Sequence, residues 1–200
     1  MDRSEARILR ELLEAGRGRA WLDEADDFAA ALRAAPRQVG GLLLVGPGDA
    51  EPWHMTAHLS EDARLLGLDQ LVPTLVRAAP EAGAPTQLSV GLDRISSAGR
   101  SDAVLLVAAD DPESAVLERV ADAKKHGARI LTLGQVAPLA ADLAHDALAV
   151  PQPSEVMDLP SFDGAQHLVS AAAVDGRQRG LILRLRRWIE AVNGPRVDRW

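Results

Sequence analysis

Two apolar runs separated by an amphipathic segment constrain the fold of this chain more than any other feature. The first spans residues 102–109 (DAVLLVAA) and the second residues 129–133 (RILTL). A shorter run, residues 147–150 (ALAV), follows and is closed by Pro151. Continuous apolar runs that alternate with helical patterns are typical of parallel strands covered on both faces. Such sheets bind ligands just beyond the carboxyl ends of their strands, so we expect functional residues at that edge.

The same patterns assign the other segments. Residues 41–45 (GLLLV) predict the first strand, and residues 87–92 (QLSVGL) predict a short second strand at or near a sheet edge. Apolar residues at helical spacing predict helices over residues 4–14, 21–33, 52–67, 71–79, 162–170 and 181–192. We therefore expect an α/β fold, a three-layer αβα sandwich with about five mostly parallel strands.

Composition narrows the functional class. A chain of 200 residues that is 47% apolar can bury one core, so we expect a single domain. The chain has no apolar span of about 18 residues and no apolar segment after its charged amino terminus, so we expect a cytoplasmic protein without a membrane helix. The net charge of −7 opposes binding to nucleic acid. The absence of cysteine excludes disulfides and thiolate chemistry.

The order of elements resembles a known family, the sugar isomerase (SIS) domains. In that family a central strand, a phosphate loop, a helix ending in a Gly-Ala pair, a strand, a Pro-Leu-Ala helix and a short strand ending in Pro follow one another, as in residues 102–151 here. Residues 41–49 (GLLLVGPGD) are similar to the family's first strand and glycine turn, and residues 162–170 (FDGAQHLVS) to its carboxyl-terminal helix. The resemblance covers about residues 20–175.

The resemblance implies a sugar-phosphate-like or other small polar ligand and a homo-oligomer, either a dimer or a tetramer. It divides the chain into leading helices over residues 1–35 and an SIS-like α/β domain over residues 36–200 that includes the carboxyl-terminal helices. In the family such leading helices commonly pack against a second subunit. The alternative is that they pack against the sheet of their own chain.

The phosphate loops differ from the family pattern. After the central strand the family has a loop rich in Ser and Thr, whereas this chain has Asp110 and Asp111, with Ser114 as the nearest hydroxyl. Two unit charges about 4 Å apart cost about 1 kcal/mol in water and about 4 kcal/mol at an effective dielectric constant of about 20. A dianionic phosphate in the family's position is therefore unfavourable. In the first loop, Gly46 and Gly48 are followed by an aspartate, Asp49, where the family has serine.

The same acidic segment carries a helix-start signal. Aspartate is a preferred N-cap residue, proline is favoured at the first helical position and glutamate suits the first turn. Asp111, Pro112 and Glu113 have this order. We therefore expect Asp111 to cap the helix that follows.

A pair of histidines is the second candidate site. His54 and His58 share one face of the predicted helix with Glu61 and Asp62, and the start of this helix borders the expected cleft. Histidines at positions i and i+4 can bind one metal ion, so zinc is a possible cofactor here. The alternative is a solvated or intersubunit pair. Gln166 and His167 lie in the segment that resembles the family's carboxyl-terminal helix, and they are candidates to line the cleft.

Three functions fit these features. The first is an SIS-type domain, with or without a regulatory role, that binds a sugar-phosphate-like or other small polar ligand through altered phosphate loops. The second is an aldose–ketose isomerase, with Glu51, His54 or His58 as the base that moves a proton between two sugar carbons. The third is an oligomeric scaffold whose cleft has decayed. The ligand-binding candidates in the first reading are Gly46, Gly48, Asp49, Asp110, Asp111, Ser114, Gln166 and His167.

Overall fold

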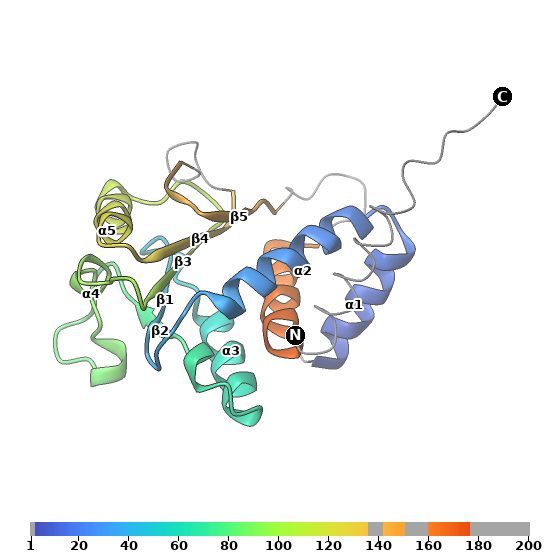
Figure 1. The fold of residues 1–200 in the computed structure, drawn as a ribbon, viewed down its shortest axis with the longest axis horizontal. Helices are drawn as coiled ribbons and strands as arrows, with labels where there is room; N and C mark the ends of the chain where they lie inside the picture. Colours follow the sequence, from blue (N-terminus) through green and yellow to red (C-terminus); the bar gives the residue numbers. More distant parts are fainter. Residues whose placement is uncertain (1–2, 136–141, 151–159, 177–200) are drawn as a thin grey trace.

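A computed structural model describes residues 3–135, 142–150 and 160–176 of the chain (Figure 1). The predicted helix over residues 181–192 lies outside these ranges, and so does most of the Pro-Leu-Ala segment over residues 138–144. Within the described ranges, no helix is both long enough and apolar enough to cross a membrane.

A five-stranded sheet forms the centre of the molecule. Its strands are β1 (Leu42–Val45), β2 (Thr74–Val76), β3 (Ala103–Ala108), β4 (Arg129–Gly134) and β5 (Asp146–Leu148). They are ordered β2-β1-β3-β4-β5, and every neighbouring pair is parallel. Leu44 of β1 is in register with Leu75 on one side and with Leu105 on the other. The predicted parallel α/β sheet is confirmed.

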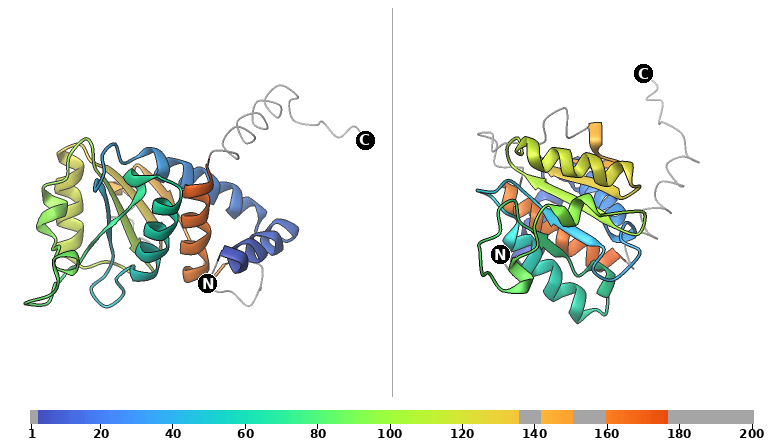
Figure 2. Two further views of the ribbon diagram at one scale, coloured as in Figure 1. Left: turned by 90° about the horizontal axis from the view of Figure 1, so that it is seen from below. Right: turned by 90° about the vertical axis from the view of Figure 1, so that its left-hand side faces the viewer.

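Helices cover both faces of the sheet (Figure 2). Alternate residues of β1 and β3 belong to two separate apolar clusters, because successive side chains of a strand point to opposite faces. One face packs against α2 (Arg19–Ala34), α3 (Trp53–Leu65) and a helix over residues 162–176. The other face packs against α4 (Asp93–Ser96) and α5 (Ser114–Lys125). These three layers are the predicted αβα sandwich.

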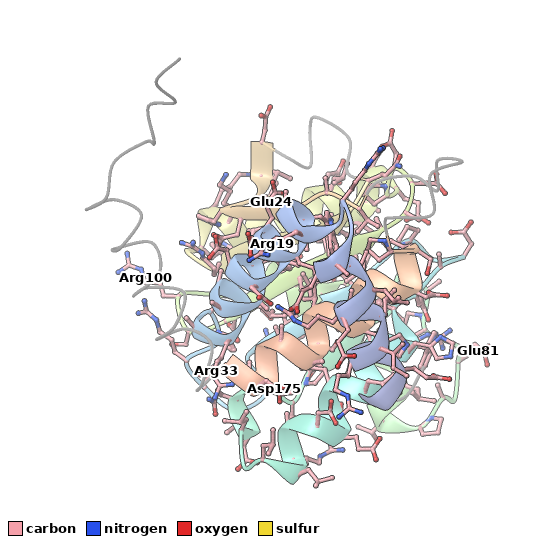
Figure 3. All side chains as sticks on the ribbon, turned by 90° about the vertical axis from the view of Figure 1, so that its right-hand side faces the viewer. Arg19, Glu24, Arg33, Glu81, Arg100 and Asp175 are labelled. Atoms are coloured by element: carbon pink, nitrogen blue, oxygen red, sulfur yellow. The ribbon has the colours of Figure 1, made fainter. Side chains whose placement is uncertain are left out.

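The second leading helix, α2, packs on its own chain. The indole Nε1 of Trp21 donates a hydrogen bond of 2.8 Å to the carbonyl of Ala149. Arg33, labelled in Figure 3, donates to the carbonyls of Ala173 and Val174 at 2.7 and 2.8 Å. The own-chain alternative is therefore correct for α2, because its buried face belongs to the same cluster as one face of the sheet.

The first leading helix, α1 (Arg3–Ala15), is less buried against the rest of the chain than α2. It lies beside α2 in Figure 1, and an ion pair between Arg10 and Asp26 joins the two helices. Leu13 of α1 is buried in the apolar cluster that α2 and α3 form with one face of the sheet. Ile8 and Leu12, however, are 53% and 66% exposed. One apolar stripe of α1 therefore faces outward.

Two sequence predictions in the region between β1 and β3 are wrong. Residues 71–79 were expected to form a helix, but they contain the end of the 3-10 helix η1 (Asp69–Leu71) and then strand β2. Residues 87–92 were expected to form a strand, but they contain part of the 3-10 helix η2 (Thr86–Leu88), and Gly91 makes only an isolated bridge to Arg77. For residues 71–79 the reason lies at Pro73, which disfavours helix at the preceding Val72, where φ is −67° and ψ is 110°.

Candidate functional site

The strand order places the expected ligand edge between β1 and β3. From β1 the chain moves outward to β2 on one side, and then returns to β3 on the other side of β1. Ligands bind at such reversals, beyond the carboxyl ends of the strands. Residues 46–52 follow β1 and residues 109–113 follow β3, so these two loops face the same edge.

A carboxylate bridges the two loops. The backbone N–H of Gly48 donates a hydrogen bond of 3.0 Å to Oε1 of Glu113. A phosphate held by the first loop would need such an N–H donor. The Glu113 carboxylate therefore takes up an N–H group that could otherwise bind an anionic ligand.

The start of α5 differs from the sequence prediction, and the expected Asp111 cap is wrong. The helix begins at Ser114, and its N-cap residue is Glu113, which has an extended backbone and makes no side-chain capping bond. The Glu113 carboxylate reaches across to Gly48 instead. Asp110, Asp111 and Ser114 are exposed at this edge.

The glycines of the first loop have different roles. A Cβ on Gly46 would lie 2.8 Å from the carbonyl oxygen of Val107 and 2.9 Å from Cδ of Pro52, so no other residue fits there. Gly46 thus allows the loop to approach β3 closely. Gly48 is exposed and offers its N–H, and the adjacent Asp49 is also exposed.

Glu51 is bound to a residue that the sequence analysis missed. Nε of Arg77 lies 2.9 and 3.2 Å from the two carboxylate oxygens of Glu51, whose side chain is only 5% exposed. The Arg77 guanidinium carbon also lies 5.3 Å from the ring centroid of Trp53. Arg77 follows β2, the strand that the sequence pattern assigned as helix, so it was not placed at this edge.

Histidines from two helices meet next to this edge. The rings of His58 on α3 and His167 on helix 162–176 lie 4.4 Å apart between centroids, at an interplanar angle of 63°. His54, one turn before His58, lines a cavity of about 330 Å³ together with Leu9, Pro160, Ser161, Asp163, Gly164 and His167. Gln166 is buried outside this lining, and its amide donates to Asp163 at 3.4 Å.

His167 is held in its neutral form. Burial lowers the pKa of His167 below its ordinary value of 6.5, and the nearby rings of His58 and His54 lower this pKa further. The Asp163 carboxylate acts in the opposite direction but does not outweigh them. The cavity therefore presents a neutral imidazole at pH 7, which can both donate and accept a hydrogen bond.

The residues described do not complete a metal centre around the histidine pair. No three His, Cys, Asp or Glu side chains within those ranges are placed to hold one ion. Zinc at His54 and His58 would need three protein ligands for a catalytic site and four for a structural one. In the described part of the chain, this cluster is a pair of rings in edge-to-face contact beside a cavity of mixed polar and apolar lining.

Comparison with known proteins adds evidence on the fold. No protein-family model and no curated protein matches the chain. Among solved structures, the sugar isomerase domain of an RpiR transcription factor from Sphaerobacter thermophilus is 16% identical, with a TM-score of 0.51, over 82% of this chain and 84% of that one.

Two further structures are similar over only about half of their own length. A putative sugar-binding protein from Salmonella typhimurium LT2 is 16% identical, over 91% of this chain and 52% of that one, with a TM-score of 0.47. The NanR protein of Vibrio vulnificus, solved with ManNAc-6P, is 13% identical, over 77% of this chain and 54% of that one, with a TM-score of 0.44. The strand order and the likeness to the RpiR domain together show that this chain has the fold of a sugar isomerase domain.

Proposed function

We propose that this chain binds a small, polar, sugar-like ligand at the carboxyl edge of its sheet, as a binding domain that does not isomerise the ligand. The cavity of about 330 Å³ lined by His54, Asp163 and His167 carries the proposal. His54 lies in the first turn of α3, which follows β1. Phe162, which stands between the lining residues Ser161 and Asp163 in the sequence, lies beside Gly134, the last residue of β4. The cavity is thus next to the edge where parallel sheets bind ligands.

The groups around the cavity suit hydroxyl groups better than a dianion. Neutral imidazole and the Asp163 carboxylate accept hydrogen bonds from hydroxyls. The hydroxyl of Ser161 accepts a bond of 3.1 Å from the N–H of Gly164, which leaves its own proton free to donate. The volume is at the lower end of the range of about 300–1,000 Å³ that is usual for small-molecule sites. A monosaccharide-sized ligand fits these properties.

The surroundings of Glu51 support binding over isomerisation. A general base must reach the proton that it removes. Both oxygens of Glu51 are bound to Arg77 and the side chain is buried, so this carboxylate is a structural partner. The Glu113 carboxylate on the N–H of Gly48 further opposes a phosphate in the loops.

Calorimetry with glucose and glucose 6-phosphate tests the proposal. We expect the wild-type protein to bind the neutral sugar at least as tightly as the phosphate. Glu113→Ala frees the N–H of Gly48 and removes one negative charge, which is worth about 1 to 4 kcal/mol at a separation of about 4 Å. Affinity for glucose 6-phosphate should therefore rise by about tenfold or more in this variant.

Two further variants complete this experiment. Glu118→Ala removes the same charge from an exposed position on α5, so its affinity for glucose 6-phosphate should match the wild type. His167→Phe keeps a ring beside His58 but removes the polar atoms, and glucose binding should fall by about tenfold. Glucose binding that is equal in wild type and His167→Phe would contradict the proposed site. An equal increase in affinity for glucose 6-phosphate in Glu113→Ala and Glu118→Ala would refute the proposal that Glu113 opposes a phosphate.

We also propose that the chain forms a homodimer or a higher homo-oligomer through α1. Ile8 and Leu12 lie one helical turn apart and are 53% and 66% exposed, which makes an outward apolar stripe. We expect light scattering to show a dimer or tetramer at micromolar concentration, and a monomer in Ile8→Lys/Leu12→Lys. Glu5→Lys/Glu11→Lys, on exposed positions of the same helix, should keep the oligomer. A stable wild-type monomer would contradict the proposal.

A further inference from the structure

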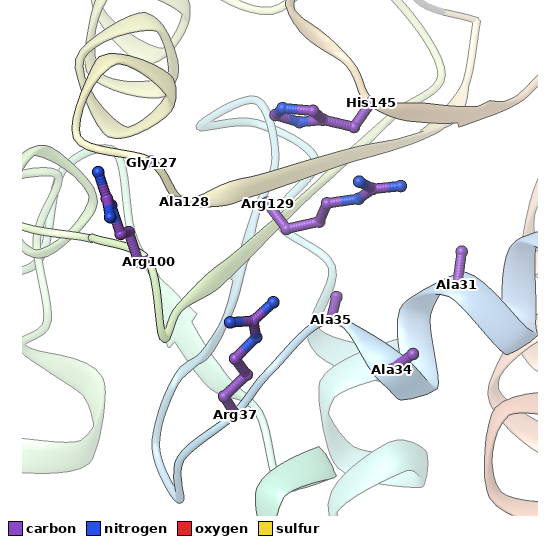
Figure 4. A pocket seen from close by; sticks show the side chains of 9 residues that line it. All are labelled: Ala31, Ala34, Ala35, Arg37, Arg100, Gly127, Ala128, Arg129 and His145. Carbon is purple, nitrogen blue, oxygen red and sulfur yellow. The ribbon is translucent and has the colours of Figure 1, made fainter.

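A second cavity lies at the opposite edge of the sheet, where the strands begin. Its volume is about 370 Å³, and its polar lining consists of Arg37, Arg100, Arg129 and His145. Arg129 is the first residue of β4, and Arg37 and Arg100 precede β1 and β3. In Figure 4 the Arg37 side chain points toward the side of Arg129 and His145, the Arg100 side chain extends beside Gly127, and the last turns of α2 close one side.

Two of the three guanidinium groups have no charged partner in the described ranges. Arg129 is paired with Asp146, at 2.6 Å from Nη2 and 3.0 Å from Nε. The nearby Asp102 accepts bonds from Gln38, Arg94 and the N–H of Gly99. These acids already have partners, and neither Arg37 nor Arg100 makes a side-chain ion pair or hydrogen bond with any other described residue.

The helix ends at this edge do not cancel the positive charge. α2 ends beside the cavity at Ala34, and α5 ends just before the lining residue Gly127. Each helix carboxyl end carries roughly half a negative charge. Lys124 and Lys125 in the last turn of α5 balance that helix. Arg37 and Arg100 therefore leave a net positive cavity in a chain whose overall charge is −7.

His145 adds a hydrogen-bond donor, because its contacts fix which ring nitrogen carries the hydrogen. Its Nδ1 accepts a hydrogen bond of 3.0 Å from the backbone N–H of Ile130. An accepting Nδ1 carries no hydrogen, so in the neutral ring the hydrogen is on Nε2. The polar side chains that line the cavity thus offer hydrogen-bond donors.

We propose that this cavity binds a small phosphate monoester. Arginine guanidinium groups bind phosphate oxygens through two parallel hydrogen bonds, which makes them well suited to this group. The volume lies within the usual range for small-molecule sites and leaves room for a few carbon atoms beside the phosphate. A nucleic acid is disfavoured by the net charge of −7. This site is at the edge opposite to the proposed sugar cavity, so each can fail without the other.

Calorimetry at low ionic strength, with inorganic phosphate and glycerol 3-phosphate as separate probes, tests the proposal. We expect the wild-type protein to bind both, and the ester more tightly. Arg37→Gln/Arg100→Gln should weaken binding of both probes by tenfold or more. Arg17→Gln/Arg19→Gln changes the net charge equally but lies at the other end of α2, and it should bind both probes as the wild type does (Figure 3 labels Arg19).

A second variant keeps both arginines. Ala34 is exposed on the last turn of α2 and lines the cavity, so Ala34→Glu places a carboxylate at the wall without disturbing the core. This variant should also lose at least tenfold in affinity for both probes. The proposal is overturned if the wild type binds neither probe or if both cavity variants bind like the wild type. Inorganic phosphate that binds as tightly as the ester would overturn the assignment to a monoester.

Discussion

Gly134→Ala is expected to remove a large part of the stability of the fold. Gly134 ends β4 with φ of 122°, a conformation that residues with a side chain rarely adopt. A Cβ at this position would lie 2.0 Å from the carbonyl oxygen of Ala108 in the paired strand β3 and 2.8 Å from Cε2 of Phe162. The backbone of a central strand would have to move to accept it. We expect a loss of about 4 kcal/mol or more, out of a total of about 5 to 15 kcal/mol for a domain of this kind.

Urea unfolding followed by circular dichroism measures this loss, and Gly67→Ala is its matched control. Gly67 also has a positive φ, of 64°, but a Cβ there would meet no atom within 4 Å. This control therefore carries the strain of a left-handed backbone, though not that of φ near 122°, and no collision, so we expect it to cost about 1 to 2 kcal/mol. Equal losses in the two variants would show that the contact with Ala108 and Phe162 adds nothing.

The central strands could be predicted from sequence because burial on both faces leaves a clear pattern. β1 and β3 lie within residues 41–45 and 102–109, and β4 covers residues 129–133 and one residue more, and apolar residues predominate in all three runs. β2 is a short edge strand of three residues, Thr74–Val76, within a stretch whose spacing also fits a helix. Local residues indicate the strand nevertheless. Pro73 disfavours helix at the residue before it, and the β-branched residues Thr74 and Val76 favour a strand.

The edge that carries the two candidate loops could be predicted from sequence, but the contacts at that edge could not. The order of strands and glycines placed residues 46–49 and 110–114 at one edge, as the structure does. The bond between Gly48 and Glu113 spans 65 positions, and the pair of Glu51 and Arg77 spans 26. Each of these two contacts depends on how separate elements pack, so no local sequence pattern predicts it.

The amino-edge cavity was missed for the same reason. Arg37 and Arg100 come from the connections before β1 and β3 and Arg129 from the start of β4, and the chain is rich in arginine throughout. A parallel sheet brings the starts of its strands together, as it does the carboxyl ends.

Asp102→Asn is expected to remove a large part of the acid sensitivity of the fold. Asp102 is 6% exposed at the start of β3 and joins three connections. Its Oδ1 accepts bonds of 2.9 Å from Gln38 and from Arg94, and its Oδ2 accepts one of 2.9 Å from the N–H of Gly99. Breaking this buried network costs about 3 kcal/mol, because Arg94 and the N–H of Gly99 lose a charged acceptor.

The direction of the pH dependence follows from the pKa of Asp102. Burial alone would raise this pKa, but the bonds from Gly99, Arg94 and Gln38 outweigh burial and lower it below its ordinary value. A carboxyl group whose pKa is lower in the folded state stabilises the fold above its unfolded pKa, which is about 3.9. This stabilisation is lost as the pH falls through the folded pKa.

Unfolding in urea from pH 7 down to pH 2.5 therefore separates Asp102 from the other carboxylates. Those groups titrate in both proteins, so they cancel when the free energies of unfolding of wild type and Asp102→Asn are subtracted. The difference should be constant above about pH 5 and should shrink below it, because protonated aspartate resembles asparagine in charge. Asp93→Asn, at an exposed position on α4, should differ little from wild type at any pH. A wild-type advantage over Asp102→Asn that persists unchanged at pH 2.5 would mean that the charge of Asp102 does not stabilise this edge of the sheet.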